Sequence, residues 1–357
     1  MIRALASDSW PRPLQLLLAL AIGIALAIVA VAVVPVLLLE RADDWRAYAV
    51  AADALRTGAP LYPWSAHPDL QDIHSQGHFS YFYPPPLAAV WSTGLTAESF
   101  AIVKLVALAG AVALLARRCG AGWPVAAAVA VAAVTSSPAI YDVALGNVML
   151  FFAAAAALSL AEPGWAESGA LGVTCAIAFK PAIGPYLAWL LLRRRTSFGR
   201  TFLAGLATTV VFAVLLGPGR YFEYLEALPK SAVLAAPFTG NLGLSAISPL
   251  AGVVGIAIAY AWTAAAAVRL DERAAAVVAL AMTQLAQPTI GLNYAALLIP
   301  GVIFLWTVDR RAAVAMAIGL PIVVIVSPVL AAIVLAGTAT IASILAGREQ
   351  AGAMARA

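Results

Sequence analysis

Residues 13–39, PLQLLLALAIGIALAIVAVAVVPVLLL, contain no charged side chain, and this stretch decides the class of fold. A helix needs roughly 20 apolar residues to cross a bilayer, whereas the apolar core of a cleaved signal peptide has only about 7–15. The stretch therefore predicts an uncleaved first membrane span. Because a backbone in lipid must satisfy its own hydrogen bonds, we expect this span to be helical.

The rest of the chain has the same character. Of its 357 residues, 63% are hydrophobic and 11% are charged, and the mean hydropathy is +0.95. A soluble domain carries about 25% charged residues, so this composition excludes a soluble protein. The arginines cluster at the ends of apolar blocks, which is the ordinary membrane pattern. We therefore predict membrane lipids, and no nucleic acid, as partners.

The apolar blocks predict one all-α polytopic membrane domain over residues 1–357, with about twelve transmembrane helices. Several blocks are shorter than a full span, so we expect tilted or broken helices. The expected spans are roughly 13–39, 100–116, 123–137, 147–161, 168–180, 182–193, 201–217, 249–268, 274–288, 294–308, 312–326 and 329–346.

The basic residues indicate the orientation of these spans. Loops that face the cytoplasm carry an excess of lysine and arginine. With cytoplasmic N- and C-termini, fourteen of the 21 basic residues fall on the cytoplasmic side. A further span near residues 83–97 would move the Arg193–Arg195 run outside, so we interpret residues 84–93 as re-entrant or interfacial. The predicted location is a cell (plasma or inner) membrane, with long outer loops at about 40–99 and 218–248.

The first outer loop begins with a pattern typical of a helix in the membrane interface. Its apolar face would hold Trp45, Tyr48, Ala52 and Leu55. Asp44 would then lie at the N-terminus of this helix, close to the end of the first span. Two interpretations stay open: Asp43 or Asp44 caps the helix, or one of them is a general base near the membrane surface.

Later in this loop, Tyr83 precedes three prolines, which prevent a regular helix as far as about Pro86. Aromatic residues ahead of such a rigid segment can line a groove for a sugar or a lipid, or can belong to an aromatic belt. The three histidines also lie here, and His74 and His78 have a spacing that suits a metal on a helix. A third ligand with suitable spacing is missing, so solvated histidines are favoured and no metal site is predicted.

Ionisable and amide side chains inside a bundle are functional candidates, because they are costly to place in lipid. Lys180, directly before Pro181, can hold a phosphate as a point charge or extend to the lipid headgroups. The other candidates are Asp142 with Gly146-Asn147, Arg220, Asn241 and Asn293.

Several short motifs, taken in order, resemble glycosyltransferase family 87, which includes polyprenol-phosphate-mannose-dependent mannosyltransferases. The first outer loop of that family is similar to DWRAY at residues 44–48, GAPLY at 58–62 and YPPPL at 83–87. Downstream, the segments similar to the family are LGNV at 145–148, FKP at 179–181 and NLGLS at 241–245. The likeness extends from about residue 13 to about residue 308.

This resemblance implies a GT-C-like bundle that transfers a sugar, most simply mannose, from a polyprenyl-phosphate donor to a hydroxyl of a lipid-linked or glycan acceptor. It implies that Asp44 is the catalytic base, that the reaction inverts the anomeric centre, and that no metal or cofactor is required. Lys180 and Arg220 would stabilise the phosphate that leaves. The expected substrate-binding residues are Tyr48, Tyr83, Lys180, Arg220, Asn241 and Asn293.

The chain departs from the family pattern at one place. Asn293 stands where the family usually has a histidine, although Pro288 and Tyr294 match. A catalytically inactive family member is therefore one alternative, and a multispan transporter or lipid flippase is another. Polar residues concentrated at one face favour the enzyme over a transporter, whose polar sites lie near the bilayer midplane.

Overall fold

The computed structural model describes residues 43–66, 81–162, 164–235, 242–287 and 291–354. All regular secondary structure in these ranges is helical, which confirms the all-α prediction. The expected first span, the three histidines and Asn241 lie outside the described residues.

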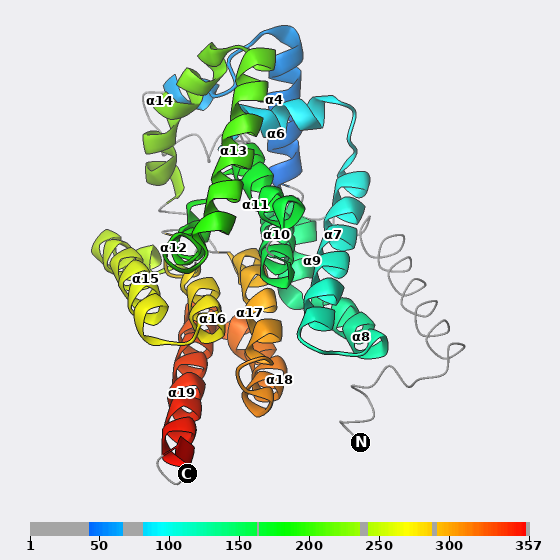
Figure 1. Cartoon of the computed structure of the whole chain (residues 1–357). Coiled ribbons are helices and arrows are strands. Elements are labelled where there is room, and N and C mark those ends of the chain that lie inside the picture. Colours follow the sequence, from blue (N-terminus) through cyan, green and yellow to red (C-terminus); the bar gives the residue numbers. More distant parts are fainter. Residues whose placement is uncertain (1–42, 67–80, 163, 236–241, 288–290, 355–357) are drawn as a thin grey trace.

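Helices make up all of the regular elements of the described chain (Figure 1). The first ten elements are α4 (Asp43–Thr57), η2 (Pro63–Ala66), α6 (Pro85–Ser92), α7 (Ala97–Arg118), α8 (Trp123–Val134), α9 (Ser137–Leu145), α10 (Met149–Ala161), α11 (Trp165–Ala178), η3 (Pro181–Ile183) and α12 (Gly184–Arg193). The others are α13 (Arg195–Leu216), α14 (Pro218–Ala235), η4 (Leu244–Ala246), α15 (Pro249–Arg269), α16 (Glu272–Met282), η5 (Leu292–Leu297), α17 (Leu298–Leu305), α18 (Arg310–Val326) and α19 (Pro328–Met354).

Polar caps start several of these helices. The Thr96 hydroxyl accepts the Ser99 backbone N–H in a reciprocal capping box before α7. Asp271 caps α16, and Asp309 caps α18, each by accepting two backbone N–H groups. Capping side chains satisfy backbone groups that have no partner within the helix, so these positions favour new helix starts.

Only some of the described helices have the length of a complete span. Four are long and apolar enough to cross a membrane: α7, α13, α15 and the part of α19 up to Arg348. The pair α8 and α9 adds a fifth if the two helices, bent by 48°, form one broken span. The broken character of the shorter spans was predicted, whereas the count of about twelve spans stays a prediction.

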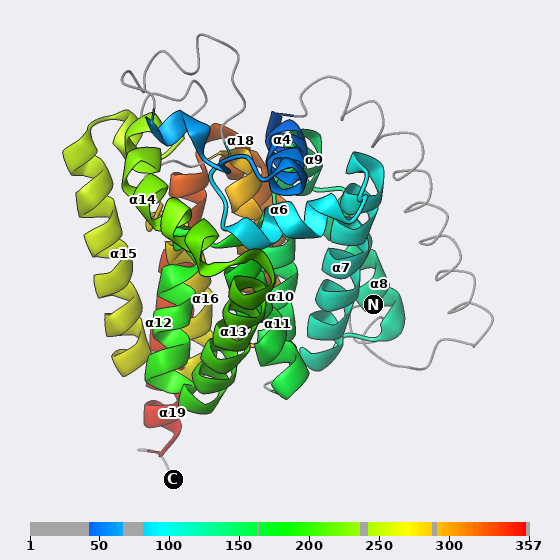
Figure 2. The same cartoon turned by 90° about the horizontal axis from the view of Figure 1, so that it is seen from above.

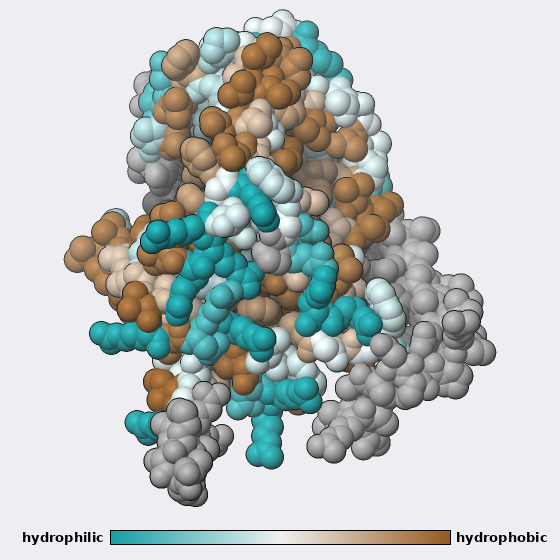
Figure 3. Space-filling model, viewed as in Figure 1, coloured by the Kyte–Doolittle hydropathy of each residue, from teal (hydrophilic) through white to brown (hydrophobic). Residues whose placement is uncertain are grey.

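The helices form a bundle with two distinct ends. In Figure 2, α4 and α14 lie at one end, and the C-terminus of α19 lies at the other. The turn between α15 and α16 belongs to this second end, because Ser343 of α19 donates to Asp271 at 2.7 Å. Arg194 bonds Glu272 at 2.6 Å, so the arginines between α12 and α13 lie there too. Figure 3 shows hydrophilic side chains gathered around α12 and α16, with apolar surface on both sides.

Small residues let two of the helices approach closely. A Cβ on Gly172 of α11 would lie 2.1 Å from the Thr201 carbonyl oxygen of α13. This is the small-residue packing typical of membrane helices, in which van der Waals contact replaces the hydrophobic effect. Near its C-terminal end α13 exposes large apolar side chains, such as Val214 at 78% and Leu215 at 71%. Such a surface is suited to lipid rather than to water.

The first helix of the described chain packs on protein. As predicted, α4 is a helix, but its apolar face is covered by side chains of the same chain. Tyr48 is fully buried, with its ring centroid 5.2 Å from that of Tyr83 and 5.3 Å from that of Trp91. The position of α4 at the depth of the lipid headgroups stays a prediction. The segment that we interpreted as re-entrant or interfacial, residues 84–93, contains the short helix α6.

Candidate active site

Asp44 lies in the first turn of α4, and two segments from elsewhere in the chain reach its carboxylate. The Asn147 amide donates to Asp44 Oδ2 at 2.6 Å, and the Tyr83 hydroxyl lies 3.4 Å from the same oxygen. These bonds favour a functional carboxylate over the N-cap interpretation of Asp44. Both bonds found within the described chain end on Oδ2, so the geometry leaves Oδ1 for another partner.

The protonation of Asp44 reflects its surroundings. Burial raises the pKa of the Asp44 carboxyl above its ordinary value, while the Lys180 charge and the Asn147 amide act in the opposite direction. A carboxyl group with a raised pKa is a stronger base once it is ionised. Because Asp44 is only partly covered, it can also receive a proton from a bound molecule.

The Lys180 ammonium contacts the ring of Tyr83, whose hydroxyl lies near this carboxylate. Lys180 occupies the break between α11 and η3, where Pro181 ends the possibility of a continuous helix. Its ammonium is 4.4 Å from the centroid of the Tyr83 ring and 5.5 Å from that of the Tyr294 ring. It also donates to the Tyr294 hydroxyl at 3.2 Å. The two rings hold the ammonium by cation–π attraction, and one of them, Tyr83, also donates its hydroxyl to Asp44.

Behind Asn147 lies a buried ion pair. Lys104 of α7 and Asp142 of α9 are 2.7 Å apart, and both side chains have 0% exposure. Lys104 also donates to the Asn147 carbonyl at 2.6 Å. Removing one member of a buried pair leaves an uncompensated charge, which costs about 3–5 kcal/mol. The loop that carries Asn147 is therefore firmly held.

Gly146 lets this loop approach α4. It ends α9 in the left-handed conformation, at φ +75°, which glycine adopts without strain. A Cβ here would meet the Trp45 backbone nitrogen at 3.0 Å and the Trp45 Cβ at 3.2 Å. The close approach brings Asn147 within reach of Asp44, although 103 residues separate the two in the sequence.

Three of the predicted site residues therefore come together: Asp44, Tyr83 and Lys180. Tyr48 packs behind them against the Tyr83 ring. Asn293 is buried beside Tyr294, and its Nδ2 has no hydrogen-bond partner among the described residues. Whether Tyr48, Asn241 and Asn293 bind substrate stays a prediction.

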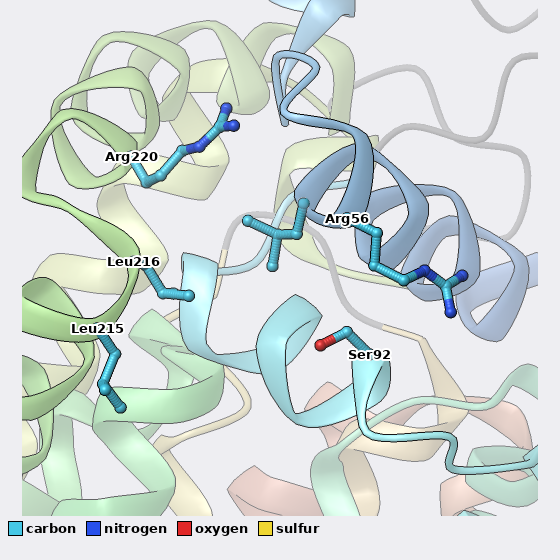
Figure 4. A pocket seen from close by; sticks show the side chains of 6 residues that line it. Arg56, Ser92, Leu215, Leu216 and Arg220 are labelled. Atoms are coloured by element: carbon cyan, nitrogen blue, oxygen red, sulfur yellow. The ribbon is translucent and has the colours of Figure 1, made fainter.

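Arg220 lies at a different place. It starts α14, donates to the Ala59 carbonyl at 2.9 Å and bonds Glu223 at 3.0 Å. It also lines a cavity of about 280 Å³ between α4, α6, the end of α13 and the start of α14. Figure 4 shows Arg220 and Arg56 on two sides of this cavity, together with Ser92, Leu215 and Leu216. The contacts described for Arg220 join it to Ala59, just after α4, and to Glu223 rather than to the residues around Asp44.

Sequence reasoning missed two contributors and undervalued a third. Lys104 and Tyr294 were not among the expected site residues, and Asn147 was noted with Asp142 and in the LGNV motif but was not predicted to bind substrate. Lys104 had a usable signal, because a lysine seven residues into an apolar helix is costly in lipid unless it has a partner. Tyr294 had none beyond its family match, because its partner Lys180 is 114 residues away.

An apolar helical bundle with lipid-sized spans, and with a carboxylate and a lysine that both contact Tyr83, defines an integral membrane protein with a polar site that can do acid–base chemistry. A sequence model of glycosyltransferase family 87 matches residues 81–289, more than half of the chain. The chain therefore belongs to glycosyltransferase family 87, and the protein is a membrane glycosyltransferase. The matched part includes Tyr83, Asn147 and Lys180, and Asp44 reaches it through the contacts above. No curated protein and no solved structure matches the chain.

Proposed function

We propose that this protein transfers mannose from a polyprenyl-phosphate donor to a hydroxyl of a lipid-linked or glycan acceptor, with inversion of the anomeric centre. The family supports glycosyl transfer in general. The choice of mannose and of a polyprenyl-phosphate donor rests on the resemblance of the loop motifs. The observation that carries the mechanism is that the Asp44 carboxylate and the Lys180 ammonium both contact Tyr83, while Asn147 donates to Asp44.

Asp44 acts as the general base in this mechanism. The acceptor hydroxyl gives its proton to Oδ1 of Asp44, which no hydrogen bond among the described residues occupies, while its oxygen attacks the anomeric carbon of the donor. Asn147 holds the other oxygen, Oδ2, so that the carboxylate keeps one orientation. Positioned general bases contribute roughly 10²–10⁴-fold to rate. Attack from the face opposite the phosphate inverts the anomeric carbon.

Lys180 assists the leaving group. As the bond between the anomeric carbon and the phosphate oxygen breaks, negative charge grows on the lipid phosphate. A preorganised cation near that oxygen stabilises the charge without further rearrangement. The phosphate already leaves well, so the proposed reaction requires no metal and no cofactor.

The lipid portion of the substrates has suitable surfaces nearby. The exposed apolar side of α13 leads to the cavity at the start of α14, where leucines lie next to Arg56 and Arg220. An apolar wall beside guanidinium groups suits the anionic headgroup of a lipid-linked acceptor, so the proposed substrate contact of Arg220 is with that acceptor rather than with the phosphate that leaves at Lys180. Tyr48, Asn241 and Asn293 are proposed as further substrate-binding residues.

We propose that transfer takes place on the extracytoplasmic side of a cell membrane, with both termini in the cytoplasm. The arginine-bearing turns lie at the end of the bundle opposite α4, as a cytoplasmic end would. Family membership favours this enzyme over a transporter or lipid flippase. An inactive family member is the competing possibility, because Asn293 replaces a histidine.

A transfer assay tests the proposal. The purified full chain is incubated with polyprenyl-phosphate mannose and a lipid-glycan acceptor, and product is measured by mass spectrometry. Wild type should form product, and Asp44→Asn should lower turnover by at least about 10²-fold because it loses the base. Parallel donors carrying arabinofuranose or glucose identify the sugar.

Asp53→Asn is the matched control, because Asp53 lies on the same helix with a side chain that is 68% exposed and pairs only with its neighbour Arg56 among the described residues. It should keep wild-type turnover. Equal turnover of wild type and Asp44→Asn would rule out the mechanism, and absence of transfer from every donor would support the inactive alternative.

A further inference from the structure

Lys104 is a fully buried cation that has no place in the mechanism above. It has three N–H donors, and the structure assigns a partner to each. They are Asp142 Oδ1 at 2.7 Å, the Asp142 carbonyl at 3.2 Å and the Asn147 carbonyl at 2.6 Å. A lysine that uses all its donors at fixed acceptors is a structural clamp rather than a mobile ligand group.

Asp142 completes the clamp from the other side. Its second oxygen, Oδ2, accepts the backbone N–H of Met149 at 2.9 Å. The carboxylate thus ties the end of α9 to the start of α10, and the loop between them contains Asn147. Lys104 joins this loop to α7, so three helices fix the position of one short segment.

The clamp formed by Lys104 and Asp142 acts on Asp44 through the Asn147 side chain. The Asn147 side chain accepts the Val148 N–H through Oδ1 at 2.8 Å, which fixes the direction of its amide nitrogen. That nitrogen donates to Asp44 Oδ2 at 2.6 Å. The buried pair is therefore connected to the carboxylate through Asn147, whose backbone carbonyl bonds Lys104 and whose side-chain amide bonds Asp44.

We propose that Lys104 and Asp142 are positioning residues for the transfer reaction, which hold Asn147 so that its amide sets the orientation of the Asp44 carboxylate. This inference rests on the proposed function for its catalytic consequence. Neither residue touches the substrate. Their effect on rate passes through Asn147, and a displacement of about 1 Å at a catalytic group can cost roughly 10²-fold.

The charges around Asp44 make the proposal measurable. Lys180 and Lys104 lower the pKa of Asp44, whereas Asp142 raises it, in addition to the larger effect of burial. The neutral phenols of Tyr83 and Tyr48 face it from the loop and from α4 itself. Because Lys104 and Asp142 have opposite charges, removing both at once cancels most of their direct electrostatic effect and leaves the loss of positioning.

The first experiment measures the titration of Asp44 without requiring turnover. Infrared difference spectra of the full chain in lipid nanodiscs follow the C=O stretch of the protonated carboxyl, with Asp44→Asn as the blank. The double variant Lys104→Met/Asp142→Leu should titrate at a higher pH than wild type, as Asn147→Ala should, because both lose the amide bond that lowers the pKa. The single variant Lys104→Met should also titrate at a higher pH, because it loses both the positioning of Asn147 and a positive charge that lowers the pKa of Asp44.

The double variant also guards against simple misfolding, since replacing a whole buried ion pair by apolar side chains is often tolerated, whereas breaking it is not. The matched control is Tyr186→Phe, which removes another buried hydrogen bond, to Ser159 at 2.6 Å, from the same bundle. It should leave the titration of Asp44 and the rate unchanged.

The second experiment measures transfer. The double variant should lose roughly 10–10²-fold in kcat with a donor KM within about threefold of wild type. Combining it with Asn147→Ala should add little, because residues that act through one contact are not additive. A folded double variant with the wild-type titration and kcat would overturn the proposal. A wild type that transfers no sugar would instead refute the proposed function, and the titration would still decide whether the clamp positions Asp44.

Discussion

Replacing Gly146 by alanine should slow transfer more than it weakens the fold. The new Cβ would lie 3.0 Å from the Trp45 backbone nitrogen, whereas ordinary van der Waals contacts begin at 3.4 Å. Trp45 and its neighbour Asp44 must therefore move by roughly 0.4 Å away from the loop that holds Asn147. If about 1 Å of displacement costs roughly 10²-fold, this shift lowers kcat about sixfold.

Gly58→Ala provides the matched control. Gly58 has the same φ of +75°, but a Cβ there would meet nothing within 4 Å. Both substitutions place alanine in the left-handed region, at a cost of about 1–2 kcal/mol in unfolding free energy. Only Gly146→Ala adds the contact with Trp45, so the difference between the two variants isolates the effect of that contact.

The assay compares the two variants in initial rates at saturating donor and in thermal unfolding, both in the same detergent. Similar losses of stability, with a selective loss of kcat in Gly146→Ala, are the expected result. If the two variants show equal rates, the close approach of Gly146 to Trp45 does not control the position of Asp44.

Three further predictions follow from the same site. Transfer should be lost as the pH falls through the raised pKa of Asp44, because only the ionised carboxylate accepts a proton. A pH profile of kcat/KM that stays flat on its acid side would contradict this prediction. Lys180→Met should lower kcat by roughly 10–10²-fold, because the lysine stabilises the leaving phosphate. It should also move the acid limit of the pH profile to higher pH, because the lysine lowers the pKa of Asp44. An unchanged pH profile would show that Lys180 does not act on Asp44. In a chain whose native cysteines are replaced, Asp53→Cys should react with a membrane-impermeant maleimide in intact cells, whereas labelling only after lysis would place α4 in the cytoplasm.

Local patterns in the sequence predicted the helical elements well. Hydropathy along the chain anticipated α7, α13, α15 and α19, because a run of apolar side chains in lipid leaves the helix as the only backbone with its hydrogen bonds satisfied. The same reasoning did not predict the 48° bend between α8 and α9. A bend changes the direction of a helix without changing its composition, so hydropathy cannot predict it.

The candidate site was predicted in part for a similar reason. Asp44, Tyr83 and Lys180 could be named from the resemblance of their motifs, and the structure places them together. The roles of Lys104 and Asn147 depend on distances across 38 and 103 residues, which no local pattern contains. Hydrogen bonds form over about 3 Å, so only the packing of the chain decides which polar groups meet.

The sequence by itself determined that this protein is a helical membrane protein, because 11% charged residues are too few to form the polar surface of a soluble protein. It also carried the motifs of its family. Only the tertiary structure decided that the buried pair of Lys104 and Asp142 supports the loop next to Asp44. It also decided that Arg220 contacts Ala59 and lines a separate cavity. The preference of apolar side chains for lipid over water depends on residue type alone and can be read from composition. A site depends on a few directional contacts that exist only once the helices have packed.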